Sequence, residues 1–327
     1  MKKVYLIILF ILVVLTILFL WPRQPLKGII YGVSFSKLHA SELELDWKKT
    51  YIAVLDDLGV RNLRLSAHWP NTEPIEDKYN FADLDYQMKE AQKRDASVIL
   101  AVGRRLPGWP ECHDPDWILK KTIEERNDEL LEYMILVVNR YKAYKNIKYW
   151  QVENEPFLAF FSRSACGELD KDFIQKEIDL VKQLDPSRKV LITASGEFDT
   201  WYNAYTRGDI FGSSVYLYVW WKTGPVRYPI TPALFQIKRF IIETFFGKKP
   251  SILIELSAEP WLRQPIVTAS TEMLLDRMGI DKFNEMIDFA SRTGFREQYL
   301  WGAEWWYYMR TKQNHPEFWE RAQSLFK

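Results

Sequence analysis

The sequence predicts an α/β protein, a single (β/α)8 TIM barrel preceded by an N-terminal transmembrane helix. Two observations predict the barrel: strand-like and helix-like segments alternate from residue 28 onward, and eight strands can be counted without an internal linker. A third observation, an uninterrupted apolar run at residues 4–21, predicts the transmembrane helix.

The apolar run 4–21 contains only one polar residue, Thr16. As a helix it would be about 27 Å long, close to the thickness of a bilayer's hydrocarbon core. It exceeds the apolar core of a secretory signal, and no small-residue cleavage site follows it, although a cleaved signal remains the alternative. We therefore expect residues 1–27 to form a signal anchor with a short linker, and residues 28–327 to form the barrel domain.

The positive charges around the run set the expected orientation. Lys2 and Lys3 precede it together with the α-amino group, whereas Arg23 and Lys27 follow it. This slight bias favours a cytoplasmic N-terminus. We expect a single-pass membrane protein, held in the membrane by this helix, with its barrel domain outside the cytoplasm.

The composition is that of an ordinary globular protein with a large core. The 327 residues are 47% hydrophobic and 27% charged, with a net charge of +1. A chain so close to neutral offers no basic surface for nucleic acid, so no nucleic-acid partner is expected. Aromatic residues make up 15%, including 14 tryptophans, which fill cores and also offer flat faces to sugar rings.

The strands and helices follow from residue patterns. The helix 46–58 places apolar residues on one face and ends at Gly59, and the helix 232–246 is apolar enough either to be well covered by the barrel or to touch a membrane. The eight predicted strands are 28–36, 61–67, 97–103, 147–155, 190–195, 210–218, 251–256 and 298–304. The other predicted helices are 83–94, 123–144, 171–184 and 282–292.

Two of these strands end on a glutamate. The stretch Tyr149-Trp150-Gln151-Val152-Glu153-Asn154-Glu155-Pro156 closes on Glu155, because a proline cannot continue the ladder of hydrogen bonds. The apolar run 251–256 carries Glu255. A carboxylate at the end of an apolar strand is costly unless it is paired, so both glutamates are site candidates.

The Asn-Glu-Pro and Ile-Glu-Leu contexts of these glutamates resemble the clan A retaining glycoside hydrolases, a superfamily of cellulase- and β-glycanase-like (β/α)8 barrels. In that clan the acid/base follows an asparagine at the end of strand 4, and the nucleophile ends strand 7. The strand count puts Glu155 and Glu255 at those positions. The resemblance covers residues 28 to about 310 and rests on short motifs.

The resemblance implies a retaining β-glycosidase with a carbohydrate substrate. Glu155 would be the general acid/base and Glu255 the nucleophile, with their carboxyl groups about 5 to 5.5 Å apart. Glu155 must keep its proton near neutral pH, so burial and a nearby charge should raise its pKa. Asn154 matches the clan's asparagine that binds the sugar 2-hydroxyl.

Supporting residues come from the same resemblance. Arg64 matches an arginine of strand 2 that keeps the nucleophile ionised, and Tyr216 matches a tyrosine that donates to the nucleophile, with Tyr218 as the alternative. Trp305 or Trp306, at the end of strand 8, matches a tryptophan platform below the sugar.

Other residues in loops at the same barrel face are candidates for substrate contact, since active sites of this fold are built there. Glu259 lies in the loop after Glu255, where it could contact substrate or form a salt bridge, and Glu153 shares the strand parity of Glu155 one layer deeper, where we expect an internal hydrogen bond. The further substrate-binding candidates are His68, Trp69 and Trp109.

No metal and no cofactor are expected, because the four histidines and two cysteines show no ligand spacing. Cys112 and Cys166 fall in loops of one barrel face and form either a disulfide or two buried thiols. The alternative function is a cell-surface barrel that binds carbohydrate with little or no catalysis. A metal-dependent hydrolase is a weaker alternative, and transglycosylation is a variant of the retaining β-glycosidase hypothesis.

Overall fold

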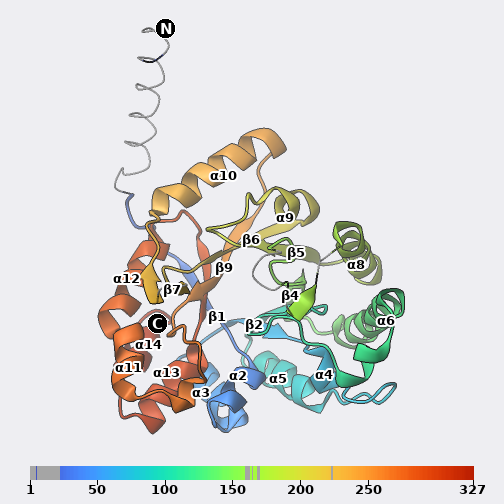
Figure 1. Ribbon diagram of the computed structural model, residues 1–327, viewed down its shortest axis with the longest axis horizontal. Helices are drawn as coiled ribbons and strands as arrows, with labels where there is room; N and C mark the ends of the chain where they lie inside the picture. Colours follow the sequence, from blue (N-terminus) through green and yellow to red (C-terminus); the bar gives the residue numbers. More distant parts are fainter. Residues whose placement is uncertain (1–4, 6–22, 159–162, 164, 168–169, 222–223) are drawn as a thin grey trace.

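The computed structural model describes Tyr5 and residues 23–158, 163, 165–167, 170–221 and 224–327. Its centre is a closed barrel of eight parallel strands, in the order β1-β10-β9-β6-β5-β4-β3-β2 around the ring (Figure 1). The barrel strands are β1 (Ile30–Ser34), β2 (Asn62–Ser66), β3 (Ser97–Val102), β4 (Ile147–Val152), β5 (Lys189–Ala194), β6 (Ile210–Val215), β9 (Ser251–Ser257) and β10 (Glu297–Trp301). The predicted (β/α)8 barrel is confirmed.

Helices surround the barrel on its outside, as Figure 1 shows. Two of the helices begin with a side-chain cap: Asp46 accepts from the first turn of α3, and Thr122 forms a capping box with Glu125 at the start of α6. The helices are α2 (Lys37–Glu42), α3 (Trp47–Asp56), α4 (Trp69–Thr72), α5 (Ala82–Lys93), α6 (Ile123–Tyr141), α8 (Lys171–Leu184), α9 (Tyr202–Arg207), α10 (Pro232–Phe246), α11 (Thr271–Arg277), α12 (Ile280–Ser291), α13 (Ala303–Lys312) and α14 (Glu317–Gln323). Short 3-10 helices lie at Asp116–Lys120 and Ile266–Thr268.

Two apolar layers hold the barrel together. A large cluster lies between strands and helices, and a small cluster joins residues of β3, β5, β6, β9 and β10: Ile99, Leu191, Ile210, Ile252, Ile254 and Tyr299. Gly32 of β1 leaves room for the Tyr299 ring, since a Cβ there would lie 2.6 Å from it. The barrel is thus filled by side chains.

Three strands end three residues earlier than predicted. β4 ends at Val152, and β6 ends at Val215 and is followed by a separate antiparallel hairpin of β7 (Tyr218–Trp221) and β8 (Gly224–Arg227). β10 ends at Trp301, because Gly302 takes a φ of 127° and α13 begins at the next residue. These early ends change which side chains reach the active-site face.

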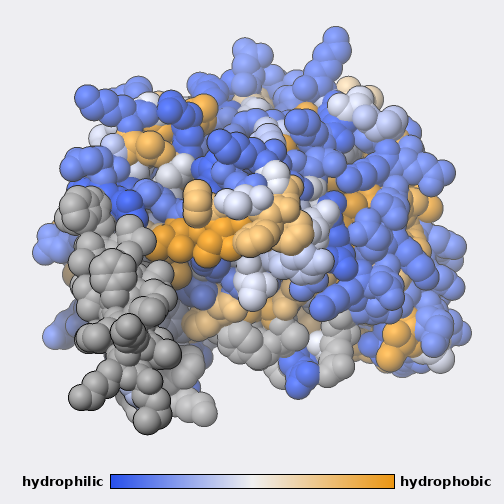
Figure 2. Space-filling view, turned by 90° about the horizontal axis from the view of Figure 1, so that it is seen from above, coloured by the Kyte–Doolittle hydropathy of each residue, from blue (hydrophilic) through white to orange (hydrophobic). Residues whose placement is uncertain are grey.

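Helix α10 packs on the barrel as a barrel helix does, through Ala233, Phe235 and Ile242. Its outer face is apolar as well, and Figure 2 looks onto this patch. Phe240 and Phe245 of this helix are 70% and 75% exposed.

The membrane prediction is corrected. Within the described residues, no helix combines the length and the apolar character that crossing a membrane requires. This finding overturns the expected single-pass membrane localisation. The apolar run 4–21 lies, apart from Tyr5, outside the described residues.

Candidate active site

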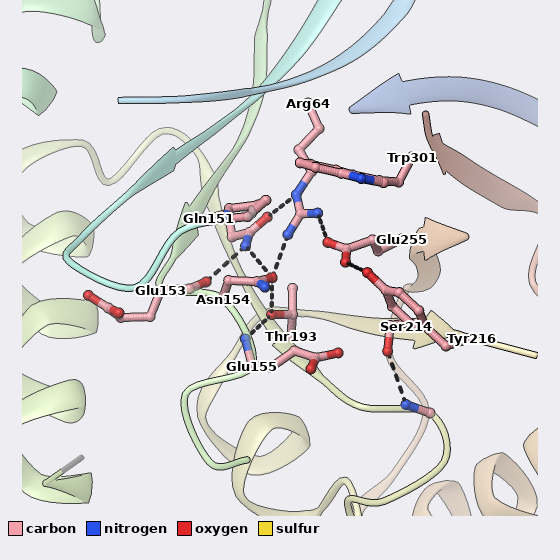
Figure 3. A network of polar contacts seen from close by, with 12 residues as sticks. Arg64, Gln151, Glu153, Asn154, Glu155, Thr193, Ser214, Tyr216, Glu255 and Trp301 are labelled. Atoms are coloured by element: carbon pink, nitrogen blue, oxygen red, sulfur yellow. Dashed lines mark hydrogen bonds and ion pairs between the residues drawn. The ribbon is translucent and has the colours of Figure 1, made fainter. Parts of the chain in front are cut away.

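The polar residues singled out in the sequence meet at the C-terminal ends of the barrel strands (Figure 3). Arg64 comes from β2, Asn154 and Glu155 follow β4, Tyr216 follows β6, and Glu255 belongs to β9. This is the face at which barrels of this type build active sites.

Glu255 is a nearly buried carboxylate held by two donors. Its Oε2 lies 2.5 Å from Nη1 of Arg64, and its Oε1 accepts a hydrogen bond from the Tyr216 hydroxyl. The residue is 7% exposed. A buried charge needs both a partner of opposite sign and hydrogen bonds, and Glu255 has both.

Arg64 connects this carboxylate to the end of β4. Its Nε donates to Oε1 of Gln151 at 2.8 Å, and its Nη2 donates to Oδ1 of Asn154 at 2.6 Å. Because a guanidinium can only donate, the Asn154 oxygen must face Arg64. The NH2 group of Asn154 is therefore the end left for a ligand.

Unlike Glu255, which is paired with the cation Arg64, Glu155 has two other glutamates as its main charged neighbours. Burial, and then the charges of Glu111 and Glu255, raise its pKa well above the ordinary range of a glutamate. Its backbone N–H donates to the Thr193 hydroxyl at 2.7 Å, which fixes the residue at a φ of 45°. Its Oε1 is buried and has no hydrogen-bond partner among the described residues. Glu155 thus has a raised pKa at the end of the barrel where Glu255 is paired with a cation.

Glu153 points away from this pair, as Figure 3 shows. Its carboxylate accepts the backbone N–H groups of Arg104 and Arg105, each at 2.6 Å. It makes the internal hydrogen bonds that we expected. It does not share a face with Glu155, because both residues lie in left-handed backbone after β4 has ended.

The aromatic residue beside the carboxylates is Trp301, which the sequence prediction missed. Figure 3 shows its ring next to Arg64 and Glu255. The predicted residues Trp305 and Trp306 are corrected, since both lie inside α13 with no exposed surface. They pack against Phe318 and Phe283, so they build the core. Trp301, not Trp305 or Trp306, is the last residue of β10, so a strand predicted to end at residue 301 would have placed Trp301 at the site.

Glu259 supports Trp301. Its Oε1 accepts from Nε1 of Trp301 at 2.7 Å, and its Oε2 lies 2.7 Å from Nε2 of His39. The His39 ring also stacks against the Trp301 indole, with centroids 5.8 Å apart. Both carboxylate oxygens are therefore used to fix the indole, and of the two expected roles of Glu259 the structure favours the salt bridge over substrate contact.

The remaining three candidates differ in exposure. His68 is buried, packs edge-on against His113, and has its pKa lowered to about 3 mainly by burial, so it is a neutral ring. Trp69 is corrected: it is 1% exposed and stacks on Tyr133 in the core. Trp109 is 66% exposed in the loop after β3 and is free to meet a ligand.

That loop is joined to the loop after β4 by a disulfide between Cys112 and Cys166, with an S–S distance of 2.03 Å. Of the two alternatives left open by the sequence, the structure has the disulfide. Glu111, next to Cys112, is a site residue that the sequence reasoning missed, because nothing in a loop pattern marks it. Within the described residues no three potential metal ligands come together.

Comparisons with known proteins show which proteins this chain resembles. A family model described as β-galactosidase, of glycoside hydrolase family 42, matches residues 44–131. Among solved structures, a cold-adapted β-galactosidase from Rahnella sp. R3 superposes with a TM-score of 0.56 at 14% identity, covering 86% of this chain and 51% of that protein.

Two further structures cover larger shares of the known proteins. A family 5 glycoside hydrolase (GH5_18) from Bifidobacterium longum has a TM-score of 0.56 at 15% identity, over 84% of this chain and 70% of that one. A β-glucosidase from Exiguobacterium marinum has a TM-score of 0.55 at 13% identity, over 85% and 89%. The predicted resemblance to clan A glycoside hydrolases is confirmed, and the proteins matched are glycosidases, as predicted. The chain spans about half the length of the β-galactosidase.

Proposed function

We propose that the protein is a retaining β-glycosidase in which Glu155 is the general acid/base and Glu255 the nucleophile. One observation carries this proposal. Two carboxyl groups lie at the same end of the barrel and interact electrostatically, and their surroundings divide the roles: burial and neighbouring charges raise the pKa of Glu155, whereas Glu255 is paired with Arg64 and accepts a hydrogen bond from Tyr216.

In the first step the Glu155 carboxyl group protonates the glycosidic oxygen while Glu255 attacks the anomeric carbon. The bond to the leaving group breaks and a covalent glycosyl-enzyme forms. In the second step Glu155, now a carboxylate, takes a proton from water, which attacks the anomeric carbon and releases Glu255. The sugar leaves with its original configuration.

The neighbouring groups support the sugar in this reaction. The NH2 group of Asn154 is oriented for the 2-hydroxyl by the Arg64 contact to its oxygen. The Trp301 indole offers a face on which the apolar side of the ring can stack, and Glu259 and His39 fix that face. Among the matched proteins are a β-galactosidase, a β-glucosidase and a GH5_18 enzyme whose E-to-A variant was solved with Manβ1-4GlcNAc, so galactosides, glucosides and mannosides are the substrates to test first.

The test is an assay of 4-nitrophenyl β-galactoside, β-glucoside and β-mannoside with the wild type, Glu155→Gln and Glu255→Gln, followed by NMR of the first-formed anomer. We expect retention and a loss of at least about 1,000-fold in either variant. Glu76→Gln, which removes an exposed carboxylate paired with Lys121, is the control and should behave as the wild type.

The pH profile supplies a second readout. Glu155 must carry a proton, so activity should fall as pH rises through its raised pKa, and the basic limb should lie well above the ordinary pKa of a glutamate. An inverted product, or full turnover in either Gln variant, would refute the assigned roles. Sugar binding without any product would favour the carbohydrate-binding alternative.

A further inference from the structure

A third carboxylate, Glu111, stands beside the two of the proposed mechanism. It lies in the loop after β3, two residues beyond the exposed Trp109. Its charge raises the pKa of Glu155, and it also interacts electrostatically with Glu255 and Arg64. The proposed two-carboxylate chemistry leaves this group without a role.

Glu111 is held in place by a buried cation. Nε of Arg105 donates to Oε2 of Glu111 at 2.8 Å, and Nη2 of Arg105 lies 2.6 Å from the same oxygen. The Arg105 side chain has no exposed surface, whereas 17% of the Glu111 side chain is exposed. Since both contacts reach Oε2, the other oxygen of Glu111 remains available to a ligand within the described part of the chain.

The backbone around Glu111 is equally fixed. Its N–H donates to Gly108 at 2.7 Å, its C=O accepts from Leu106 at 2.8 Å, and its φ is 72°. Such left-handed backbone at a residue other than glycine is costly and is typical of functional sites. The next residue is Cys112, whose disulfide ties the loop to the region after β4.

The loop that carries Glu111 lies against the Trp301 indole. A Cβ built on Gly108 would lie 3.7 Å from the Trp301 ring, so the turn that carries Glu111 rests against the indole. The loop also touches the acid/base segment, because the Asn154 N–H donates to the Arg105 carbonyl at 2.6 Å. Glu155, whose buried Oε1 has no hydrogen-bond partner among the described residues, lies at the same end of the barrel.

We propose that Glu111 is a substrate-binding residue that accepts hydrogen bonds from hydroxyl groups of an uncharged sugar unit, and that it makes the enzyme select neutral β-glycosides over acidic ones. The proposal rests on the glycosidase function above and names its substrate class. A carboxylate oxygen is a strong acceptor for sugar hydroxyls, and it repels a sugar carboxylate or sulfate.

The balance of charge in the cleft supports this selectivity. The arginines there are already paired: Arg64 with Glu255, Arg105 with Glu111, and Arg104 with Asp114 at 2.6 Å. The two histidines of the β2 and β3 loops have lowered pKa values because they are buried, so they are neutral at pH 7. An anionic sugar would therefore meet carboxylates and no unpaired cation among these residues.

The experiment compares the wild type with Glu111→Gln on two sets of substrates. The first set is the best neutral disaccharide from the glycoside screen and its monodeoxy analogues. We expect one deoxy position to cost the wild type about tenfold to a hundredfold in kcat/KM, as for a hydrogen bond to a charged group, and to cost Glu111→Gln far less. If Glu111 had a merely structural role, Glu111→Gln would lower kcat/KM equally for the parent disaccharide and for every deoxy analogue.

The second set pairs 4-nitrophenyl β-glucoside with 4-nitrophenyl β-glucuronide. In Glu111→Gln the Arg105 charge is no longer neutralised, so the glucuronide-to-glucoside ratio of kcat/KM should rise at least about tenfold. Glu76→Gln should leave this ratio unchanged. Glu111→Asp, which keeps the charge, serves as the second variant if the Gln protein does not fold, and it should retain the wild-type ratio.

The outcomes separate the two proposals. If the wild type cleaves neutral glycosides but the deoxy pattern and the glucuronide ratio are the same in wild type and Glu111→Gln, the role of Glu111 is wrong and the glycosidase stands. A wild type that prefers the glucuronide also overturns it. If the wild type cleaves nothing, the glycosidase function fails and this inference fails with it.

Discussion

Replacing Arg64 by methionine tests how the site is held together. The side chain of Arg64 has no exposed surface and donates to Gln151, Asn154 and Glu255 at 2.8, 2.6 and 2.5 Å. Methionine fills a similar volume without a charge or a donor. The change leaves a carboxylate and two amide oxygens at the centre of the barrel without their donor.

The expected magnitude follows from that burial. Removing one partner of a buried ion pair typically costs about 3–5 kcal/mol of unfolding free energy, because the other charge is left uncompensated. For a chain of this size that is a fall in Tm of roughly 4–8 °C. Activity should fall about 100-fold or more, because Glu255 and Asn154 both lose the contact that orients them.

The assays are urea unfolding followed by circular dichroism, and kcat/KM on the best aryl glycoside. Arg64→Lys is the matched control, since it keeps the charge but cannot reach all three acceptors. Its stability and its kcat/KM should lie between those of the wild type and those of Arg64→Met. In the double variant Arg64→Met/Glu255→Gln the uncompensated charge is gone, so the losses of stability should not add. Wild-type stability in Arg64→Met, or strictly additive losses, would refute this reasoning.

Two further predictions concern stability. Replacing both Cys112 and Cys166 by alanine opens a link across 54 residues and should lower the unfolding free energy by up to about 4 kcal/mol in urea titration; an unchanged midpoint would contradict it. Glu197 has its pKa raised by burial to about 7, from 4.5, so the folded state holds this proton more tightly and stability should fall as pH rises from about 4.5 to 7. Glu197→Gln should flatten that fall, and an equally steep one would show that other groups cause it.

The strands and helices of the barrel could be predicted from the sequence because they depend on local residue patterns. Apolar, β-branched runs mark the strands, and the bounds of α8 and α10 match the predicted helices. The glutamates at positions 155 and 255 could be found because each interrupts or closes such a run. Arg64 was recognisable for the same reason, as a cation inside an apolar strand.

The missed residues depend on backbone conformation and on contacts between loops. Trp301 was overlooked because the predicted strand ran on to residue 304, whereas Gly302 at a φ of 127° ends it. A glycine between aromatic residues was the available signal. Glu111 carried no comparable signal, since only the folded loop brings it to Arg105 and to the cleft.

The loops after β3 and β4 are joined by hydrogen bonds and by a disulfide, and both contain residues with strained backbone. Glu111, Glu153 and Glu155 have φ values of 72°, 56° and 45°. A left-handed residue with a side chain costs about 1–2 kcal/mol, and glycine would avoid that cost. Glutamate stands at all three positions instead, and each carboxyl group has an electrostatic or hydrogen-bonding consequence at the cleft. The strain is therefore best understood as the cost of carrying these carboxyl groups, sustained by the backbone bonds to Arg105 and by the disulfide.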